Sequence, residues 1–125
     1  MLRTTMQITR CLHTAILVSD LAQAERFYGE VLGLPKVDRN LRFPGAWYEV
    51  DGYQIHLMTA DDYAIELTNP EKLGRNPHIA FAVADLDAAK AQLIEQGYSV
   101  SLSASGRAAL FTRDPDGNVI ELSQA

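Results

Sequence analysis

A repeat at an offset of 65 residues constrains this chain more than any other feature of its sequence. When the chain is compared with itself at that offset, residues 11–60 align with residues 76–125 without a gap. Thirteen of these 50 aligned positions are identical: His13/His78, Ala15/Ala80, Val18/Val83, Asp20/Asp85, Leu21/Leu86, Ala24/Ala89, Glu30/Glu95, Arg42/Arg107, Asp51/Asp116, Gly52/Gly117, Ile55/Ile120, Leu57/Leu122 and Ala60/Ala125. A unit this long is too large for a solenoid repeat. The sequence therefore predicts two copies of one module.

Both copies predict the same order of elements. An apolar, β-branched strand comes first, at residues 11–18 and again at 77–83. Apolar residues at helical spacing follow, between a capping aspartate and a glycine: Asp20 and Gly33 in the first copy, Asp85 and Gly97 in the second. About three short extended runs come last, and the final two flank an Asp-Gly pair that predicts a hairpin.

This order predicts an α+β fold with two paired βαβββ modules. Module 1 is expected at about residues 8–60, a linker at about 61–77, and module 2 at about 78–125. The linker has two prolines and a glycine, which interrupt helices and strands.

All three histidines fall on equivalent positions of the repeat. His13 and His78 begin the first strand of each copy, whereas His56 and Glu121 share a position on the last strand. If the modules pack around a pseudo-twofold axis, the four side chains converge, and three imidazoles with one carboxylate suit a divalent transition metal. Taken one at a time, each histidine could instead be a hydrogen-bonded core residue, and Glu121 could face solvent.

Length and charge exclude several other classes of protein. A chain of 125 residues is one domain of ordinary size, and its net charge of -5 disfavours nucleic-acid binding. We expect no membrane association, because no apolar run is long enough to span a bilayer. The single cysteine, Cys11, cannot form an internal disulfide, so we expect a cytoplasmic location.

Three stretches resemble the vicinal oxygen chelate superfamily, which includes glyoxalase I, extradiol dioxygenases, fosfomycin-resistance transferases and bleomycin-resistance proteins. They read HTAILVSDLAQAERFYGEVLGL, HIAFAVADLDAAKAQLIEQG and DPDGNVIEL. The resemblance implies that the paired modules form an open barrel around a metal site, usually in a homodimer. It also implies one divalent ion (Ni, Co, Zn, Mn or Fe), with ligands at His13, His56, His78 and Glu121.

Departures from the subfamilies narrow the expected function. Glyoxalase I has a glutamate at the position of His56, and its Arg and Asn that help to hold glutathione are replaced here by Leu17 and Ala60. Bleomycin-binding relatives lack the metal ligands. We therefore expect a divalent-metal-dependent, glyoxalase-like lyase or isomerase acting on a small substrate that chelates the metal through oxygens. The alternatives are an Fe(II) extradiol-type dioxygenase and a non-catalytic small-molecule binding or resistance protein on the same fold.

Residues around the predicted ligands are candidates for catalysis and substrate binding. Glu121 is the one carboxylate in the expected shell, so it is either the catalytic base or a permanent ligand. The candidates for substrate binding are Arg42 and Arg107 for an anionic group, Trp47 and Tyr48 for an apolar wall, and Arg75 and Asn76 beside His78. The alternative for the arginines is a solvated surface, and for the aromatic residues a place in the core.

Overall fold

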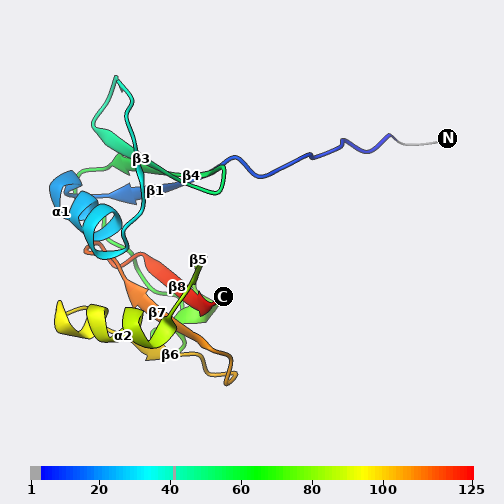
Figure 1. Cartoon of the computed structure of the whole chain (residues 1–125). Coiled ribbons are helices and arrows are strands. Elements are labelled where there is room, and N and C mark those ends of the chain that lie inside the picture. The colour runs from blue at the N-terminus through cyan, green and yellow to red at the C-terminus, as the bar shows by residue number, and fades with distance from the viewer. Residues whose placement is uncertain (1–3, 41) are drawn as a thin grey trace.

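The computed structural model describes residues 4–40 and 42–125, and it contains two modules (Figure 1). The first consists of β1 (His13–Val18), α1 (Leu21–Glu25), η1 (Arg26–Val31), β2 (Lys36–Val37), β3 (Gly45–Val50) and β4 (Tyr53–Thr59). The second consists of η2 (Leu73–Arg75), β5 (His78–Val83), α2 (Leu86–Glu95), β6 (Ser101–Leu102), β7 (Ala109–Arg113) and β8 (Val119–Gln124). Residues 4–12 form an extended arm that leaves the body at the start of β1.

Each module folds into a four-stranded sheet, with the order β1-β4-β3-β2 in the first and β5-β8-β7-β6 in the second. The first strand of each module runs parallel to the last, and the other pairs are antiparallel. This confirms the predicted α+β fold of paired βαβββ modules. The two sheets do not close on each other, and each ends on the strand that carries its first histidine.

The helices begin at the two predicted aspartates. The Asp20 carboxylate accepts a hydrogen bond from the Gln23 N–H, and Asp85 accepts one from Ala88, which satisfies a backbone donor that the helix itself leaves unpaired. The first helix widens into a π-helix at η1, where the Leu32 N–H reaches back to the Phe27 carbonyl at 2.9 Å.

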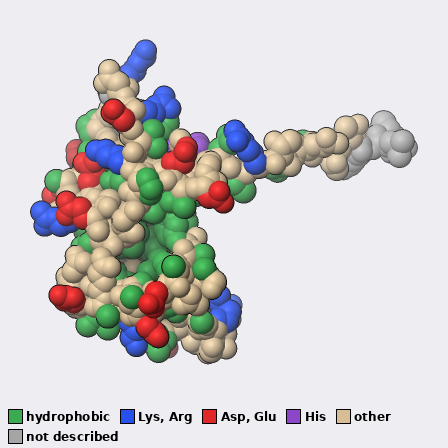
Figure 2. Space-filling view, viewed as in Figure 1, with side chains coloured by type: hydrophobic (Ala, Val, Ile, Leu, Met, Phe, Trp, Pro, Cys, Tyr) green, Lys and Arg blue, Asp and Glu red, His purple; other side chains and the backbone are tan. Residues whose placement is uncertain are grey.

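The core lies between each sheet and its helix and continues from one module into the other. Strand residues alternate, so that Ile16 and Val18 are buried while His13, Ala15 and Leu17 are exposed on the opposite face. One cluster of buried residues contains members from both modules: Ile16, Val18, Phe27, Tyr28, Ile55, Leu57, Leu93, Leu110, Ile120 and Leu122. Figure 2 shows apolar side chains in a hollow between the modules. No helix in the described residues is long and apolar enough to cross a membrane.

The two Asp-Gly turns have different structures. Asp51 and Gly52, with φ of 49° and 79°, form a two-residue turn between β3 and β4. The turn between β7 and β8 spans residues 114–118, so the register of β7 shifts by one residue. Trp47 lies opposite His56, but the residue opposite Glu121 is Phe111, not the repeat mate Thr112. The gap-free sequence alignment therefore fails on this strand.

The longer turn also fastens module 2 to module 1. Asp114 is buried, and its carboxylate accepts a hydrogen bond of 2.7 Å from the Tyr28 hydroxyl of the other module. The side chain of Asp116 accepts one of 3.1 Å from the Ser19 N–H, and the Asn118 amide donates to the Leu17 carbonyl at 3.0 Å. This turn therefore fixes how the two sheets stand relative to each other.

Candidate metal centre

The four predicted ligands form two pairs, one on the open face of each sheet. The His13 and His56 rings stack with their centroids 4.1 Å apart. In module 2, His78 Nε2 lies 3.2 Å from Glu121 Oε1. Within residues 4–40 and 42–125, no three His, Cys, Asp or Glu side chains gather as they would around one ion. Convergence of all four side chains within a single chain is therefore not observed.

The His78–Glu121 pair could supply two ligands to one ion. His78 Nδ1 lies 2.7 Å from the Asn76 carbonyl, which can only accept, so this nitrogen carries a proton. In the neutral ring, Nε2 then points a lone pair at a carboxylate oxygen. This contact is an ion pair when the ring is protonated, and with Nε2 unprotonated its 3.2 Å length suits a shared ion bound at about 2.0–2.2 Å from each atom. A carbonyl behind the histidine is also the usual support of a ligating imidazole.

Glu121 is held so that one of its oxygens remains available. Oε2 accepts hydrogen bonds from Ser123 Oγ at 2.7 Å and from Arg107 Nη1 at 3.5 Å. Burial alone would raise the pKa of Glu121, but the bonds from Ser123 and Arg107, with the charges of Arg107 and His78, outweigh burial and lower the pKa. The carboxylate is therefore ionised at neutral pH, with Oε1 facing His78.

The histidines of module 1 belong to a longer stack. The Arg39 guanidinium lies 4.0 Å above the centroid of the Trp47 ring, and that ring lies 3.7 Å from His56 at an interplanar angle of 7°. Burial lowers the pKa of His56, helped by the nearby His13 and Arg39, so this imidazole is neutral at pH 7. Its Nε2 lies 2.8 Å from Gln54 Oε1.

The stacked rings of His13 and His56 are not oriented to bind one ion together. The lone pairs of a neutral imidazole lie in the plane of the ring, so the lone pairs of two nearly parallel rings do not meet at one point. The two planes differ by 16°, and one ring has to turn before both can bind one ion. The exposed His13 is freer to turn than His56, which lies between two rings. The donor set thus fits a divalent ion, although only the His78–Glu121 pair is aligned for it.

A cavity of about 530 Å³ adjoins His78 and Glu121. The Phe111 ring, on β7, packs edge-on against His78 with centroids 5.5 Å apart. The short helix η2 covers Phe111 so closely that a Cβ on Gly74 would lie 2.7 Å from the ring. Phe111 is therefore held in place at the side of the cavity next to His78 and Glu121.

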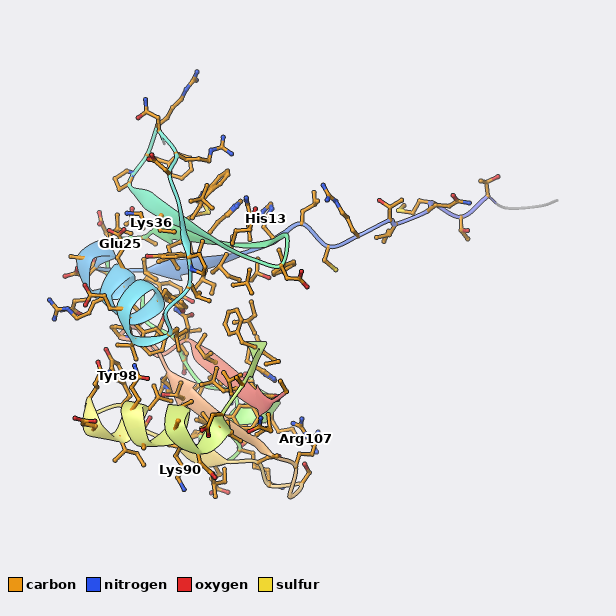
Figure 3. The ribbon with its side chains drawn as sticks, viewed as in Figure 1. His13, Glu25, Lys36, Lys90, Tyr98 and Arg107 are labelled. Atoms are coloured by element: carbon orange, nitrogen blue, oxygen red, sulfur yellow. The ribbon has the colours of Figure 1, made fainter. Side chains whose placement is uncertain are left out.

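The predicted substrate-binding residues do not all lie at the cavity. Arg75 and Arg107 line the cavity, whereas Arg42 is exposed on the loop before β3 and does not line it. Trp47 stacks on His56. Figure 3 shows His13 on one module and Arg107 on the other.

Two of the predicted substrate-binding residues have structural surroundings instead. Tyr48 is 1% exposed and packs on Gly29 beneath the helix, because adjacent strand residues point to opposite faces and Trp47 occupies the open one. Asn76 is 5% exposed, and its amide binds the backbone of Asn69, Lys72 and Leu73. These contacts leave the Asn76 side chain directed into the loop rather than toward the cavity.

Three residues near the ligands were missed by the sequence analysis. Gln54 and Ser123 each bind a predicted ligand two positions away on the same strand, so the two-residue period of a strand could have identified them. Arg39 lies on a loop, and no sequence pattern connects it with Trp47.

Comparison with known proteins identifies the family. The chain matches the model of the Glyoxalase/Bleomycin resistance protein/Dioxygenase superfamily over residues 10–122, and it belongs to that superfamily. It is 31% identical over 119 residues to the uncharacterized protein YwkD of Bacillus subtilis (strain 168), covering 88% of this chain and 92% of that protein.

Solved structures share the fold over nearly the whole chain. One is a Bacillus anthracis protein assigned to the glyoxalase family, with a TM-score of 0.76, 25% identity, and coverage of 97% of this chain and 98% of that chain. Another is TnmS3, an antibiotic binding protein from Streptomyces sp. CB03234, with a TM-score of 0.67, 26% identity, and coverage of 96% and 98%. The predicted superfamily and fold are both confirmed.

Proposed function

We propose that this protein is a divalent-metal-dependent enzyme of glyoxalase type, a lyase or isomerase whose small substrate chelates the metal through neighbouring oxygens. The observation that carries the proposal is the His78–Glu121 pair. It brings His78 Nε2 and an oxygen of an ionised carboxylate to 3.2 Å from each other. A core or surface role would not require the proton on Nδ1 and the open Oε1 that this pair combines.

The complete site requires a second copy of the chain. One chain presents the ligands as two separate pairs, and β1 and β5 lie at the ends of their sheets. Leu17 and Met58, which lie on the two strands that carry His13 and His56, are 40% and 37% exposed. Exposed sheet ends and apolar side chains favour association. In a twofold homodimer, His13 and His56 of one copy join His78 and Glu121 of the other, which gives two equivalent sites.

The residues divide the chemistry between them. A divalent ion at this site supplies Lewis acidity toward the oxygens of the substrate. Glu121 either remains a ligand throughout or accepts a proton from the carbon next to a polarised carbonyl. The bond from Ser123 Oγ to its Oε2 keeps the carboxylate in place in both cases. Trp47 stacks on His56 and Phe111 packs edge-on against His78, so an aromatic ring lies beside each ligand pair.

Metal titration tests the ligand assignment. Metal-free protein is titrated with Co²⁺, followed by calorimetry and visible absorption, and we expect one ion per chain. His78→Ala and Glu121→Ala should each abolish tight binding, whereas His56→Ala should weaken it less, because a ring must turn before the module 1 pair shares an ion. Glu95→Ala, which removes an exposed carboxylate at the end of α2, is the control. Full metal binding by both the His78 and Glu121 variants would reject the assignment.

A non-catalytic small-molecule binding protein is the second candidate. The 26% identity with the antibiotic binding protein TnmS3 favours it, as does the stacked geometry of His13 and His56, which is not aligned for an ion. Tight binding of an apolar ligand by metal-free protein, without turnover when Ni, Co, Zn, Mn or Fe is supplied, would favour this candidate over the enzyme.

A further inference from the structure

We infer that the cavity beside Glu121 selects substrates that carry an anionic group, a carboxylate or a phosphate, at a distance from their chelating oxygens. The inference rests on the proposed metal-dependent function, and it names the class of substrate. Three positively charged side chains line the cavity: Lys72, Arg75 and Arg107. The whole chain has only 11 lysines and arginines and a net charge of -5, so this local excess is unusual for the molecule.

The charge of the cavity becomes more positive when the metal site is filled. Its lining carries two carboxylates, Glu71 and Glu121, against the three positive groups. A divalent ion on Glu121 adds two positive charges to that balance. A cleft of one sign of charge concentrates ligands of the opposite sign.

Lys72 and Arg75 are presented by a turn of defined shape. The buried Asn76 amide donates to the carbonyls of Asn69, Lys72 and Leu73, at 2.9, 3.3 and 3.1 Å. Gly74, between the two positive residues, lies directly on the Phe111 ring. The Asn76 hydrogen bonds and the packing of Gly74 on Phe111 therefore order the turn before a ligand binds, which lowers the entropy cost of binding.

The lining of the cavity also includes hydroxyl groups. Ser101, Ser103 and Ser105 line it, and the Ser103 and Ser105 hydroxyls lie 2.9 Å apart. Arg107 Nε donates to Ser105 Oγ at 3.3 Å. Hydroxyls beside a guanidinium form a suitable set of donors for an anion with several oxygens.

Arg107 links the anion to the metal. In the present structure its guanidinium binds Glu121 at 3.5 Å, a long contact for a charged hydrogen bond, and the Arg107 side chain is 56% exposed. An ion bound to Glu121 neutralises the carboxylate and repels the guanidinium. Arg107 is then free to bind the anionic group of the substrate, so metal binding should strengthen anion binding.

Three related α-hydroxy acids test the inference on metal-loaded protein. Beyond the chelating oxygens, glycerate carries only an uncharged hydroxyl, whereas malate carries a carboxylate and 3-phosphoglycerate a phosphate. By calorimetry we expect malate, 3-phosphoglycerate or both to bind at least about tenfold more tightly than glycerate, with a preference that weakens as salt rises. The member that binds more tightly shows whether the group is a carboxylate or a phosphate.

Charge-removing variants connect that preference with the cavity. Arg75→Gln and Arg107→Gln should each reduce the preference at least about fivefold, and Arg75→Gln should leave Co²⁺ affinity unchanged, because Arg75 does not contact a proposed ligand. Arg26→Gln removes the same charge from an exposed position on η1 and should change nothing. Equal binding of all three acids by metal-loaded protein, or an equal loss in the Arg26 control, would overturn the inference.

Inorganic phosphate with metal-free protein separates this inference from the proposed function. We expect saturable amide shift changes in NMR spectra, confined to residues 71–75 and 101–107 and weakened in both cavity variants. If no metal binds but these changes occur, the proposed enzyme function fails and the anion site stands. If metal binds but phosphate causes no saturable change and the three acids bind alike, the anion site fails alone.

Discussion

The hydrogen bond between Tyr28 and Asp114 should be the strongest single polar link between the two modules. Tyr28 is fully buried, and its hydroxyl donates to Asp114 Oδ2 at 2.7 Å. The same carboxylate accepts bonds from the Asp116 and Asn118 N–H groups and from the Asn118 amide. Tyr28→Phe removes one bond to a charged group, which should lower the free energy of unfolding by about 1.5–3 kcal/mol.

Tyr48 provides a matched control for this measurement. It is buried to the same degree as Tyr28, but in the described part of the chain its hydroxyl has no hydrogen-bond partner. Tyr48→Phe should therefore cost nothing, and it should gain up to about 1 kcal/mol, because an unpaired buried hydroxyl is removed.

Urea unfolding of metal-free protein at a fixed concentration measures both variants, since metal and dimerisation would otherwise shift the apparent stability. In thermal unfolding of the same samples, the melting temperature should fall by roughly 5–15 °C in Tyr28→Phe and should not fall in Tyr48→Phe. A double-mutant cycle with Asp114→Asn should assign most of the Tyr28 effect to this pair. Equal losses in the two tyrosine variants, or a loss below about 0.5 kcal/mol for Tyr28→Phe, would refute the inter-module link.

Three further predictions concern the site and the core. Turnover of the hemithioacetal of methylglyoxal and glutathione should be weak with any of the five metals, because Leu17 and Ala60 offer no charged bonds worth about 1.5–3 kcal/mol each; a kcat/KM of about 10⁴–10⁸ M⁻¹s⁻¹ would contradict this. Ser123→Ala should lower Co²⁺ affinity about tenfold or more by removing a support of Glu121, and Ser123→Thr should restore it, as measured by calorimetry. Burial raises the pKa of Tyr48 to about 12, above the value of about 10 in the unfolded chain, so stability should be complete below pH 10 and decline as the pH rises toward 12. Tyr48→Phe should show a smaller decline in urea unfolding over that interval, and an unchanged pH dependence would contradict the assignment.

The sequence predicted the fold because the spacing of its apolar residues and its helix-capping residues indicate the same helices and strands. Asp20 and Asp85 cap the helices as expected, and the alternation of β1 places His13 on the open face and Ile16 in the core. The repeat could not show the one-residue shift on β7. Asp116-Gly117 has the same sequence as the first turn. However, the Asp114 side chain accepts a hydrogen bond from the Asn118 N–H within a turn of five residues, and Phe111 therefore lies opposite Glu121.

The sequence predicted the two pairs of candidate ligands, His13 with His56 and His78 with Glu121, but a single chain does not bring the four together. In the register of β5 and β8, Glu121 lies opposite Ala80, and His78 is two residues from Ala80 and on the same face, so the repeat was enough to associate His78 with Glu121. Adjacent residues of a strand point to opposite faces of the sheet. This rule, applied to Trp47 and Tyr48, would have placed only one of the two beside His56. The Arg39 stack depends on the tertiary path of a loop, for which a single sequence has no periodic signal.

A complementation experiment tests the central claim that one metal site is shared between two copies. One variant carries His13→Ala and His56→Ala, the other carries His78→Ala and Glu121→Ala, and each alone should bind no ion tightly. A heterodimer isolated through two different tags contains one intact set of four ligands and one set with none. We predict one tightly bound Co²⁺ per heterodimer, measured by elemental analysis after dialysis. A heterodimer that forms but retains no ion would contradict the shared site.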